Sequence, residues 1–494
     1  MRTHGAVYAN LREFVDDMRR RGELIEVAAP VDPKLEIAEI ADRCVKSQSG
    51  GPALLFTAVR GSTMPLLINA LATRGRMSAA LGVGGLDELG DKVRHILTTL
   101  QPGGGSALSK LFELKDLAGI MPKTVRNAPC QEVVLEGDAV DLTSLPVITC
   151  WPQDGGPFIT LPLVFTKHPQ TGSQNVGMYR MQVYDRNTTG MHWQRHKHGR
   201  EHQDASKRDA RMPVAVAIGT EPIVTYTGSA PLPANIDEML LAGFLRGKAV
   251  PMVACKTVDL QVPAEAEVIL EGYVDNAELR IEGPFGDHTG VYTPPEPFPV
   301  FHVTCMTRRR SPIYWTTIVG KPPMEDQWLG KATERLFLPL LQQMLPEVVD
   351  YNLPVEGGFQ NLVLVSVRKR YPGQAKKVMY ALWGLGHMMM LTRNIVVVDD
   401  DVDVQNVRDV AWTALNNVDA GRDLVFAPGP VDHLDHAGPM PLLGTRLGID
   451  ATRKGPEEGY MRGWPETVVM SQSVKDDVAR RWSEFGLAGV VDIR

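Results

Sequence analysis

The sequence predicts a mixed α/β and β protein in which a central β-rich domain, expected to form a barrel, is flanked by an N-terminal and a C-terminal α/β domain. Two observations predict this arrangement. Helix-like and strand-like patterns alternate up to about residue 100 and again after about residue 350. Between residues 131 and 310, short apolar runs are instead interrupted by Pro, Gly, Asp or Asn, which is typical of strands joined by turns.

The N-terminal domain is placed at residues 1–128. A helix is expected at 11–19 because apolar residues recur there at helical spacing, and a strand is expected at 24–27. Pro33 opens a second helix at 35–45, since proline fits the first turn of a helix. The QPGGGS stretch at 101–106 predicts a flexible break before the next domain.

The central domain is placed at residues 129–325, and a linking helix at 326–350. Strands are expected at the apolar runs 133–135, 163–165, 181–184, 214–218, 268–270 and 300–303. The linking segment contains a long amphipathic helix near 332–345. Pro339 is expected to kink this helix or to begin a second helical piece, because proline removes a hydrogen bond from a helix interior.

The C-terminal domain is placed at residues 351–494. Strands are expected at 361–367 and 395–398, and helices at 375–390 and 404–418. This alternation is the rhythm of βαβ units, so a second α/β domain is predicted.

Composition excludes several classes of protein. The net charge of −6 argues against a nucleic-acid partner, which needs a basic surface to meet phosphates. The five cysteines are far apart and contain no C-x-x-C pair, which indicates reduced thiols in a cytoplasmic protein. No signal peptide and no apolar run of the ~18 residues that a membrane span needs are predicted. Common nucleotide, zincin and serine-hydrolase motifs are also absent from the sequence.

A histidine-rich segment at residues 174–202 is the first candidate for chemistry. Its histidines are His192, His196, His198 and His202, and they lie near Asn175 and Arg180. Such a cluster can ligate a metal or bind a phosphate. The alternative is a solvated basic loop, because arginine and lysine residues lie among the histidines.

Carboxylates mark two further segments. Glu238 lies on an expected helix within 232–247, where a surface or capping acid is the alternative to a ligand. Glu282 and Asp287 flank a tight Gly/Pro loop, where a polar turn is the alternative. Two acids held close together raise one pKa and so provide a proton donor, while an arginine between them keeps the other acid ionised.

Taken together, these segments resemble the UbiD family of reversible decarboxylases over essentially the whole chain. Within that family the resemblance is to the bacterial 4-hydroxy-3-polyprenylbenzoate decarboxylases of ubiquinone biosynthesis. Passages that carry the resemblance include GPALLF (51–56), TCWPQDGGP (149–157), NVGMYR (175–180), EGPFGDHTGVY (282–292), GKPPMED (320–326) and LGTRLGIDATRK (443–454). Their order and spacing make a chance match improbable.

The resemblance implies a set of site residues. The metal ligands would be Asn175, His198 and Glu238, which hold Mn²⁺ or Mg²⁺ against a cofactor phosphate. The catalytic residues would be Arg180, Glu282 and Asp287. Contacts to prenylated FMN are expected from Val176, Gly177, Met178, Tyr179, Arg180, Ser229, Ala230 and Arg446. Arg446 stands where the family often has lysine, which keeps the charge but changes its shape.

The other expected site features follow from the same resemblance. The GSAP loop at 228–231 matches a loop whose carbonyl groups bind a monovalent cation, which indicates K⁺. The remaining histidines of the cluster are then expected to belong to a solvated basic loop, with His192 and His196 within reach of the cofactor. In the expected mechanism, Arg180 contacts the substrate carboxylate and organises Glu282, and Asp287 delivers the proton that replaces CO₂.

The resemblance also implies the wider context of the protein. The central domain would be a split β-barrel of the flavin-reductase kind, and the C-terminal domain would drive homo-oligomerisation, with a hexamer expected. A flavin prenyltransferase would supply the cofactor. The substrate would be an aromatic acid, and a lipid-tailed substrate would be met by peripheral contact with a membrane surface.

The sequence is also compatible with three alternatives. The first is the same chemistry on another aromatic or heteroaromatic acid, with Trp328 and Leu329 as pocket walls. The second is a flavin reductase on the same kind of barrel, which would turn over NAD(P)H without the Arg180 set. The third is a catalytically silent scaffold subunit, against which the intact acid and metal positions argue.

Overall fold

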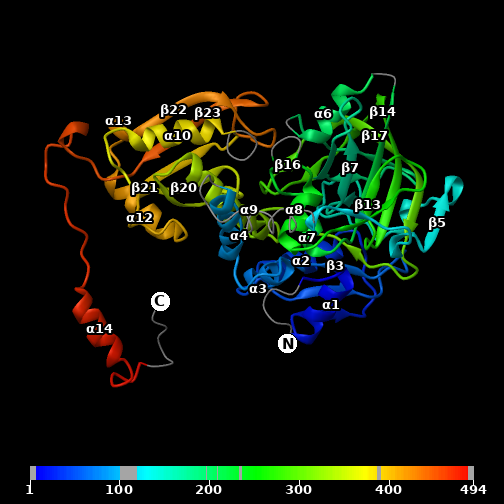
Figure 1. The fold of residues 1–494 in the computed structure, drawn as a ribbon, viewed down its shortest axis with the longest axis horizontal. Coiled ribbons are helices and arrows are strands. Elements are labelled where there is room, and N and C mark those ends of the chain that lie inside the picture. The colour runs from blue at the N-terminus through cyan, green and yellow to red at the C-terminus, as the bar shows by residue number, and fades with distance from the viewer. Residues whose placement is uncertain are drawn as a thin grey trace.

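The computed structural model describes residues 7–100, 119–195, 197–207, 210–232, 236–385 and 391–487. Figure 1 shows three regions: blue N-terminal elements beside a green central sheet, and a yellow-to-orange C-terminal sheet on the other side of helix α9. The expected break at 101–106, His196 and the end of the expected 375–390 helix lie outside the described residues.

The N-terminal region is an α/β unit, as predicted. Its elements are α1 (Leu11–Arg20), β1 (Leu24–Val27), α2 (Glu36–Val45), β2 (Ala53–Phe56), β3 (Leu66–Ile68), α3 (Arg74–Ala80) and α4 (Asp87–Leu100). Asn10 caps α1 by accepting a hydrogen bond from the backbone of Glu13, and the apolar face of α1 is buried. The expected positions of α1, β1 and α2 are confirmed to within one residue.

The N-terminal sheet contains a strand from far along the chain. Its order is β1-β2-β3-β18, and β18 (Tyr314–Trp315) pairs in parallel with β3. Both β18 side chains are almost fully buried. This strand lies inside the range expected for the central domain, so the chain crosses from one region to the other and back.

The central region is built on a seven-stranded sheet with the order β10-β17-β14-β11-β7-β8, to which β5 adds beside β17. Its strands are β5 (Val133–Glu136), β7 (Leu163–Lys167), β8 (Gln174–Met178), β10 (Thr188–Gly190), β11 (Arg211–Ile218), β14 (Val268–Glu282) and β17 (Glu296–Arg308). Neighbouring strands run antiparallel. Among the described strands, β8 and β10 do not pair with one another, so the expected barrel closure stays a prediction.

Shorter elements surround this sheet. They are β4 (Lys123–Thr124), β6 (Phe158–Ile159), β9 (Met181–Gln182), α6 (His198–Ala205), α7 (Pro222–Thr227), α8 (Glu238–Arg246), β12 (Pro251–Ala254), β13 (Gln261–Pro263), β15 (Phe285–Gly286) and β16 (Tyr292–Thr293). Several of them begin or end at residues of the candidate site, as described below.

Helix α9 (Gln327–Met344) links the central and C-terminal regions. It continues through Pro339 as one helix, so the expected second piece does not form. Proline has no N–H to offer the carbonyl of Arg335 four residues earlier. That carbonyl faces α4 closely, because a Cβ atom added to Gly90 would lie 2.9 Å from it. The Arg335 carbonyl, which lacks a helical partner, thus packs against α4, and α9 continues past Pro339 without a break.

The C-terminal region is the predicted second α/β unit. Its elements are β19 (Val348–Asn352), β20 (Leu362–Val367), α10 (Gln374–Gly384), β21 (Asn394–Asp399), α12 (Val407–Asn417), α13 (Ala420–Asp423), β22 (Leu424–Pro430) and β23 (Leu443–Asp450). The sheet order is β19-β20-β21-β23-β22, and β20, β21 and β23 are parallel neighbours. Helix α14 (Gln472–Arg480) lies beyond this sheet at the end of an extended segment, as Figure 1 shows. None of the described helices is long and apolar enough to cross a membrane.

The position of α8 depends on a close backbone contact. A Cβ atom added to Gly243 would lie 2.0 Å from the carbonyl oxygen of Ile120, so only glycine fits there. We expect Gly243→Ala to lower the free energy of unfolding by about 1–3 kcal/mol, although alanine favours a helix more than glycine does. The midpoint temperature of the first unfolding transition, in thermal denaturation followed by circular dichroism, measures this effect.

Gly75 in α3 is a matched control, because its Cβ atom would meet nothing closer than 4.0 Å. Gly75→Ala should leave the transition unchanged or raise it slightly. If Gly243→Ala behaved in the same way, the close contact between α8 and Ile120 would be contradicted.

Candidate active site

A cavity of about 430 Å³ lies where the central region, α9 and the C-terminal region meet. Its walls come from β8 and the residues after it, the 228–232 loop, the 285–288 loop, α9 and three loops of the C-terminal region. A space of this volume, with apolar walls and a few converging polar groups, is typical of a small-molecule site.

Arg180 is held between two buried carboxylates on the wall of this cavity. Its Nε atom donates to Glu282 Oε1 at 2.9 Å and its Nη2 atom donates to Glu282 Oε2 at 3.1 Å. Nη1 donates to Asp287 Oδ2, and Nη2 also donates to Thr293 Oγ1 at 3.0 Å. The side chain of Glu282 is fully buried, and those of Arg180 and Asp287 are each only 9% exposed. The structure thus brings together the three residues that the sequence assigned to catalysis.

Three separate elements deliver these side chains. Arg180 follows β8, Glu282 ends β14, and Asp287 follows the short strand β15. The ring of Phe285 packs under the guanidinium, with 4.5 Å between Arg180 Cζ and the ring centroid. The two-point contact with Glu282 fixes the plane of the guanidinium.

Both acids are held in the ionised form. Burial raises the pKa of Glu282, but the hydrogen bond from His192 and the charge of Arg180 outweigh it and lower that pKa to about 2. Burial likewise raises the pKa of Asp287, but the hydrogen bond from His288 and the charge of Arg180 hold it well below its ordinary value. The sequence predicted a raised pKa for one acid. That prediction is wrong, because the guanidinium lies against both carboxylates.

Two histidines flank the acids in opposite charge states. His192 Nδ1 lies 3.1 Å from Glu282 Oε2, and burial and the nearby Arg180 lower the pKa of this imidazole. His288 Nδ1 lies 2.9 Å from Asp287 Oδ1. Burial lowers the pKa of His288, but the hydrogen bond and the charge of Asp287 outweigh it and raise that pKa to about 9. Sequence reasoning placed His192 near the cofactor and missed His288, for which adjacency to Asp287 was the available signal.

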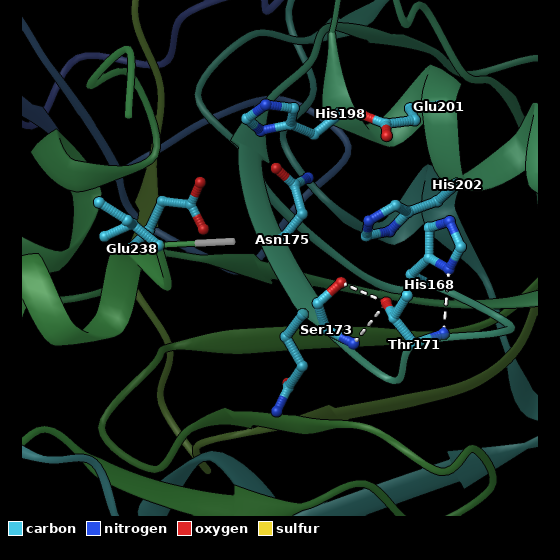
Figure 2. Close-up of a pocket in the computed structure, with 10 residues that line it drawn as sticks. His168, Thr171, Ser173, Asn175, His198, Glu201, His202 and Glu238 are labelled. Carbon is cyan, nitrogen blue, oxygen red and sulfur yellow. Dashed lines mark hydrogen bonds between the residues drawn. The ribbon is translucent and has the colours of Figure 1, made fainter. Parts of the chain in front are cut away.

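Asn175, His198 and Glu238 come together at one end of the cavity. Asn175 lies on β8, while His198 and Glu238 are the first residues of α6 and α8. All three line the large cavity and also a smaller outer pocket of about 80 Å³. Figure 2 shows the amide of Asn175 facing the carboxylate of Glu238, with the imidazole of His198 above them. Their arrangement fits the metal-ligand set that the resemblance implied.

The chemistry of this set suits a hard divalent cation. Burial raises the pKa of Glu238 to about 7, so a cation beside its carboxylate would stabilise the ionised form. One oxygen of Glu238 accepts a hydrogen bond of 2.9 Å from the backbone of Val176, which fixes its orientation. Within the described ranges no group of three or more His, Cys, Asp or Glu side chains could hold a metal, so the amide oxygen of Asn175 would have to complete the set.

Most residues expected to contact the cofactor line the cavity. These are Val176, Gly177, Met178, Tyr179, Arg180, Ser229 and Ala230. The 228–231 loop is tied to β8, because the carbonyl of Gly228 accepts a 2.9 Å hydrogen bond from the backbone of Met178. A Cβ atom added to Gly177 would lie 2.3 Å from the Tyr179 ring, so this strand packs too tightly there for a larger residue.

Two expected positions lie elsewhere. Arg446 is on β23, where its guanidinium lies 5.0 Å from the centroid of the Trp383 ring, and it is not among the described residues that line the cavity. Trp328 points away and donates from Nε1 to the carbonyl of Ala72 at 3.0 Å, whereas its neighbour Leu329 forms part of the cavity wall. Of the two residues that were expected to form walls of the pocket, only Leu329 therefore lines the cavity.

Sequence reasoning missed the residues that close the cavity from the far side. They are Asp326 and Thr333 from the α9 segment and Phe359, Asp432 and His433 from the C-terminal region. Asp326 ends the GKPPMED passage but was given no role there, and the other four lie in loops or on a helix face without a motif of their own. His433 also contacts the central region, since its Nε2 atom lies 3.1 Å from Glu296 Oε2.

Comparison with protein families gives matches along most of the chain. Three domain models of 3-octaprenyl-4-hydroxybenzoate carboxy-lyase match in order: the N-terminal domain at residues 15–93, the Rift-related domain at 123–322 and the C-terminal domain at 327–451. An uncharacterised protein of Archaeoglobus fulgidus is 53% identical over 97% of this chain and 98% of its own length. An uncharacterised protein of Aquifex aeolicus is 47% identical over 98% of this chain and 100% of its own length.

Solved structures with the same fold include a decarboxylase and a UbiD-class enzyme. The closed form of vanillic acid decarboxylase from Sedimentibacter hydroxybenzoicus is 27% identical, with a TM-score of 0.83 over 97% of this chain and 99% of that chain. The UbiD-class enzyme HmfF from Pelotomaculum thermopropionicum, in complex with FMN, is 26% identical, with a TM-score of 0.79 over 94% of this chain and 98% of that chain. An evolved dimeric form of HmfF in complex with prFMN has a TM-score of 0.76 at 26% identity and covers 96% of this chain and 100% of that chain.

All three domains of one family are thus matched in sequence order, and the same fold is found in family members of similar length. The chain therefore belongs to the UbiD family and is a carboxy-lyase.

Proposed function

We propose that this protein is a prenylated-FMN-dependent, metal-dependent enzyme that removes CO₂ reversibly and without oxidation from an aromatic carboxylic acid. The observation that carries the proposal is the buried Arg180–Glu282–Asp287 cluster on the wall of a cavity that also holds Asn175, His198 and Glu238. A flavin reductase does not require a guanidinium paired with two buried acids. A scaffold subunit would require neither this cluster nor the three proposed metal ligands.

The residues of the cavity suit a bound flavin phosphate and a metal ion. Asn175, His198 and Glu238 would hold Mn²⁺ or Mg²⁺, which would neutralise the phosphate. The backbone after Asn175 and the residues Ser229 and Ala230 would contact the cofactor. The complexes of HmfF with FMN and prFMN support prenylated FMN as the cofactor. When bound, prenylated FMN supplies the electron sink that loss of CO₂ from an aromatic carbon requires.

The protein side chains position the substrate and move the proton. Arg180 contacts the substrate carboxylate and organises Glu282, while Asp287 delivers a proton to the carbon that loses CO₂. The apolar side chains of Leu329, Phe359 and Leu434 form walls that hold an aromatic ring and exclude water.

The proposed substrate is a 4-hydroxy-3-polyprenylbenzoate of quinone biosynthesis, on the basis of the resemblance of the sequence. Another aromatic or heteroaromatic acid would use the same cluster, and the similar enzyme of Sedimentibacter is a vanillic acid decarboxylase. We further propose a cytoplasmic homohexamer, a K⁺ ion at the 228–231 loop, cofactor supply by a flavin prenyltransferase, and peripheral contact with a membrane if the substrate carries a lipid tail.

Expression with and without a flavin prenyltransferase tests the proposal. The absorption spectrum would report the cofactor, and CO₂ release would be measured with a panel of aromatic acids that includes 3-prenyl-4-hydroxybenzoate and vanillate. CO₂ release only from the co-expressed protein is the expected result. NAD(P)H oxidation without CO₂ release would favour a reductase, and a protein that binds metal but no flavin would favour a scaffold.

Asp287→Asn should cripple turnover and leave cofactor content unchanged, because the amide keeps the shape of the side chain but cannot donate a carboxylic proton. A general acid typically contributes roughly 10²–10⁴-fold to the rate, so kcat should fall by that factor. Asp259→Asn is a matched control, since Asp259 is an exposed partner of Lys167. Near-normal turnover of the Asp287 variant would contradict the assignment.

His198→Ala should lose metal and cofactor together, because the imidazole is one of only three proposed ligands. Metal analysis of the purified holoenzyme and the absorbance of bound flavin would measure both losses. His302→Ala is the control, since His302 pairs with Glu278 and is not among the described residues of the cavity. A His198 variant that is fully loaded with metal would refute the ligand role.

A further inference from the structure

The acid assigned to protonate the substrate does not carry a proton at neutral pH. Each decarboxylation replaces CO₂ by hydrogen and so consumes one proton. Hydrogen bonds from His288 and the charge of Arg180 outweigh burial and hold the pKa of Asp287 well below its ordinary value. Given the function proposed above, on which this role rests, the proton must therefore reach Asp287 from another group during each turnover.

His288 is in direct contact with the carboxylate of Asp287. Its Nδ1 atom lies 2.9 Å from Asp287 Oδ1, and its backbone N–H donates to the same oxygen at 2.8 Å. The imidazole stacks on Phe359 of the C-terminal region, with 5.1 Å between ring centroids and 20° between ring planes. The side chain is 15% exposed and lines the cavity. The ring is thus fixed on one face by Phe359 and along one edge by Asp287.

The other ring nitrogen has no competing partner. His288 Nε2 is buried and makes no hydrogen bond to any part of the chain that the structure describes. The side-chain hydrogen bond of this imidazole is therefore directed to Asp287 alone. A proton on Nδ1 has one acceptor within reach, which is the carboxylate that protonates the substrate.

Acidic groups from three elements keep this imidazole charged. Asp287 precedes it in the chain, Asp326 lies just before α9, and Asp432 comes from the C-terminal region. Burial lowers the pKa of His288, but the hydrogen bond and charge of Asp287, with smaller contributions from the other two acids, raise it to about 9. Burial raises the pKa of Asp326 to about 7, so that group is only partly ionised near neutral pH. Below about pH 9, His288 thus holds the proton that Asp287 lacks.

The neighbouring His192–Glu282 pair shows that a histidine beside an acid is not enough. Their contact is similar, at 3.1 Å, but burial and the charge of Arg180 lower the pKa of His192. His192 is therefore neutral at neutral pH and donates its one Nδ1 proton to Glu282 without a second to give. Of the two pairs, only His288 and Asp287 combine a cation with the proposed proton donor.

We propose that His288 is the proton reservoir for Asp287. In the step, the Nδ1–H bond of His288 breaks as an O–H bond forms on Asp287, which turns the ion pair into a neutral pair. The O–H bond then breaks as a C–H bond forms at the carbon that lost CO₂, with the electron pair of the broken C–C bond. Asp287 is again a carboxylate. After the product leaves, a proton taken up from the bulk solvent passes through Asp287 and restores the imidazolium.

The pH dependence of turnover separates this role from a structural one. The holoenzyme would be prepared with a flavin prenyltransferase as wild type, His288→Gln and His302→Gln. The glutamine amide still donates a hydrogen bond to Asp287 but exchanges no proton. The substrate would be 3-prenyl-4-hydroxybenzoate or, if it is turned over faster, another acid of the panel above.

Wild-type kcat should fall as the pH rises through about 9, where His288 loses its proton. His288→Gln should lower kcat by roughly 10²-fold and leave KM little changed. The fall in kcat at basic pH, which is the basic limb of the pH profile, should be absent from this variant. His302→Gln should behave as wild type, because this histidine also pairs with a carboxylate, Glu278, but at a site outside the cavity.

A second measurement does not depend on turnover. In ¹³C-histidine NMR spectra of the holoenzyme without substrate, the His288 resonance is the one that is absent from His288→Gln. It should titrate near pH 9 in the wild type. In Asp287→Asn, the pKa of His288 should move toward the ordinary value of about 6.5. Titration of His288 near 6.5 in the wild type would overturn the reservoir role. So would wild-type kcat and an intact basic limb in His288→Gln. Absence of CO₂ from the wild type with every acid would instead overturn the proposed function itself.

Discussion

The contact of one guanidinium with two buried carboxylates is the constraint on which the rest of the site depends. A buried charge is costly unless it is paired and hydrogen-bonded, and Arg180 pairs with Glu282 and Asp287 at once. Removing Arg180 would leave the buried Glu282 with only a neutral partner, His192, and would leave Asp287 with His288 as its one cationic partner. The ends of β8 and β14 and the loop after β15 must therefore meet at one point, which restricts how the central sheet can fold.

The same cluster explains why the cavity lies at a junction of three regions. The central region supplies the charged wall, while α9 and the C-terminal loops supply Leu329, Phe359 and Leu434 on the opposite side. Phe359 then contacts the site directly through its stacking on His288. The charged and the apolar halves of the site thus come from parts of the chain that no local pattern connects.

The sequence predicted elements well where one face is regularly buried, and less well elsewhere. Helix α1 has a clear apolar stripe and was placed to within one residue. Strand β14 was expected only at 268–270 but extends to Glu282, because its second half alternates between exposed and half-buried residues and contains an irregularity after Asp275. Local apolar runs mark the buried half of such a strand and leave the rest unseen.

The candidate site divides in the same way. Asn175, His198, Glu238 and the Arg180 cluster came from motif resemblance, and the structure brings each set together. The prediction that one acid has a raised pKa was wrong, because a sequence does not give the distance from a guanidinium to both carboxylates. Arg446 was expected at the cofactor because of its motif, yet it lies over Trp383, a contact set by the packing of β23 against α10.

The strand order of the N-terminal sheet bears on how the chain is made in the cell. Strand β18 is the last of the four strands in that sheet, and its aromatic side chains are buried there. During synthesis the sheet cannot be completed until Tyr314 and Trp315 have left the ribosome, by which time the whole central sheet has emerged as well. Domains usually fold one after another from the N-terminus as they are translated. Here the first region must wait for the second, so one edge of β3 stays unpaired while the central region is made.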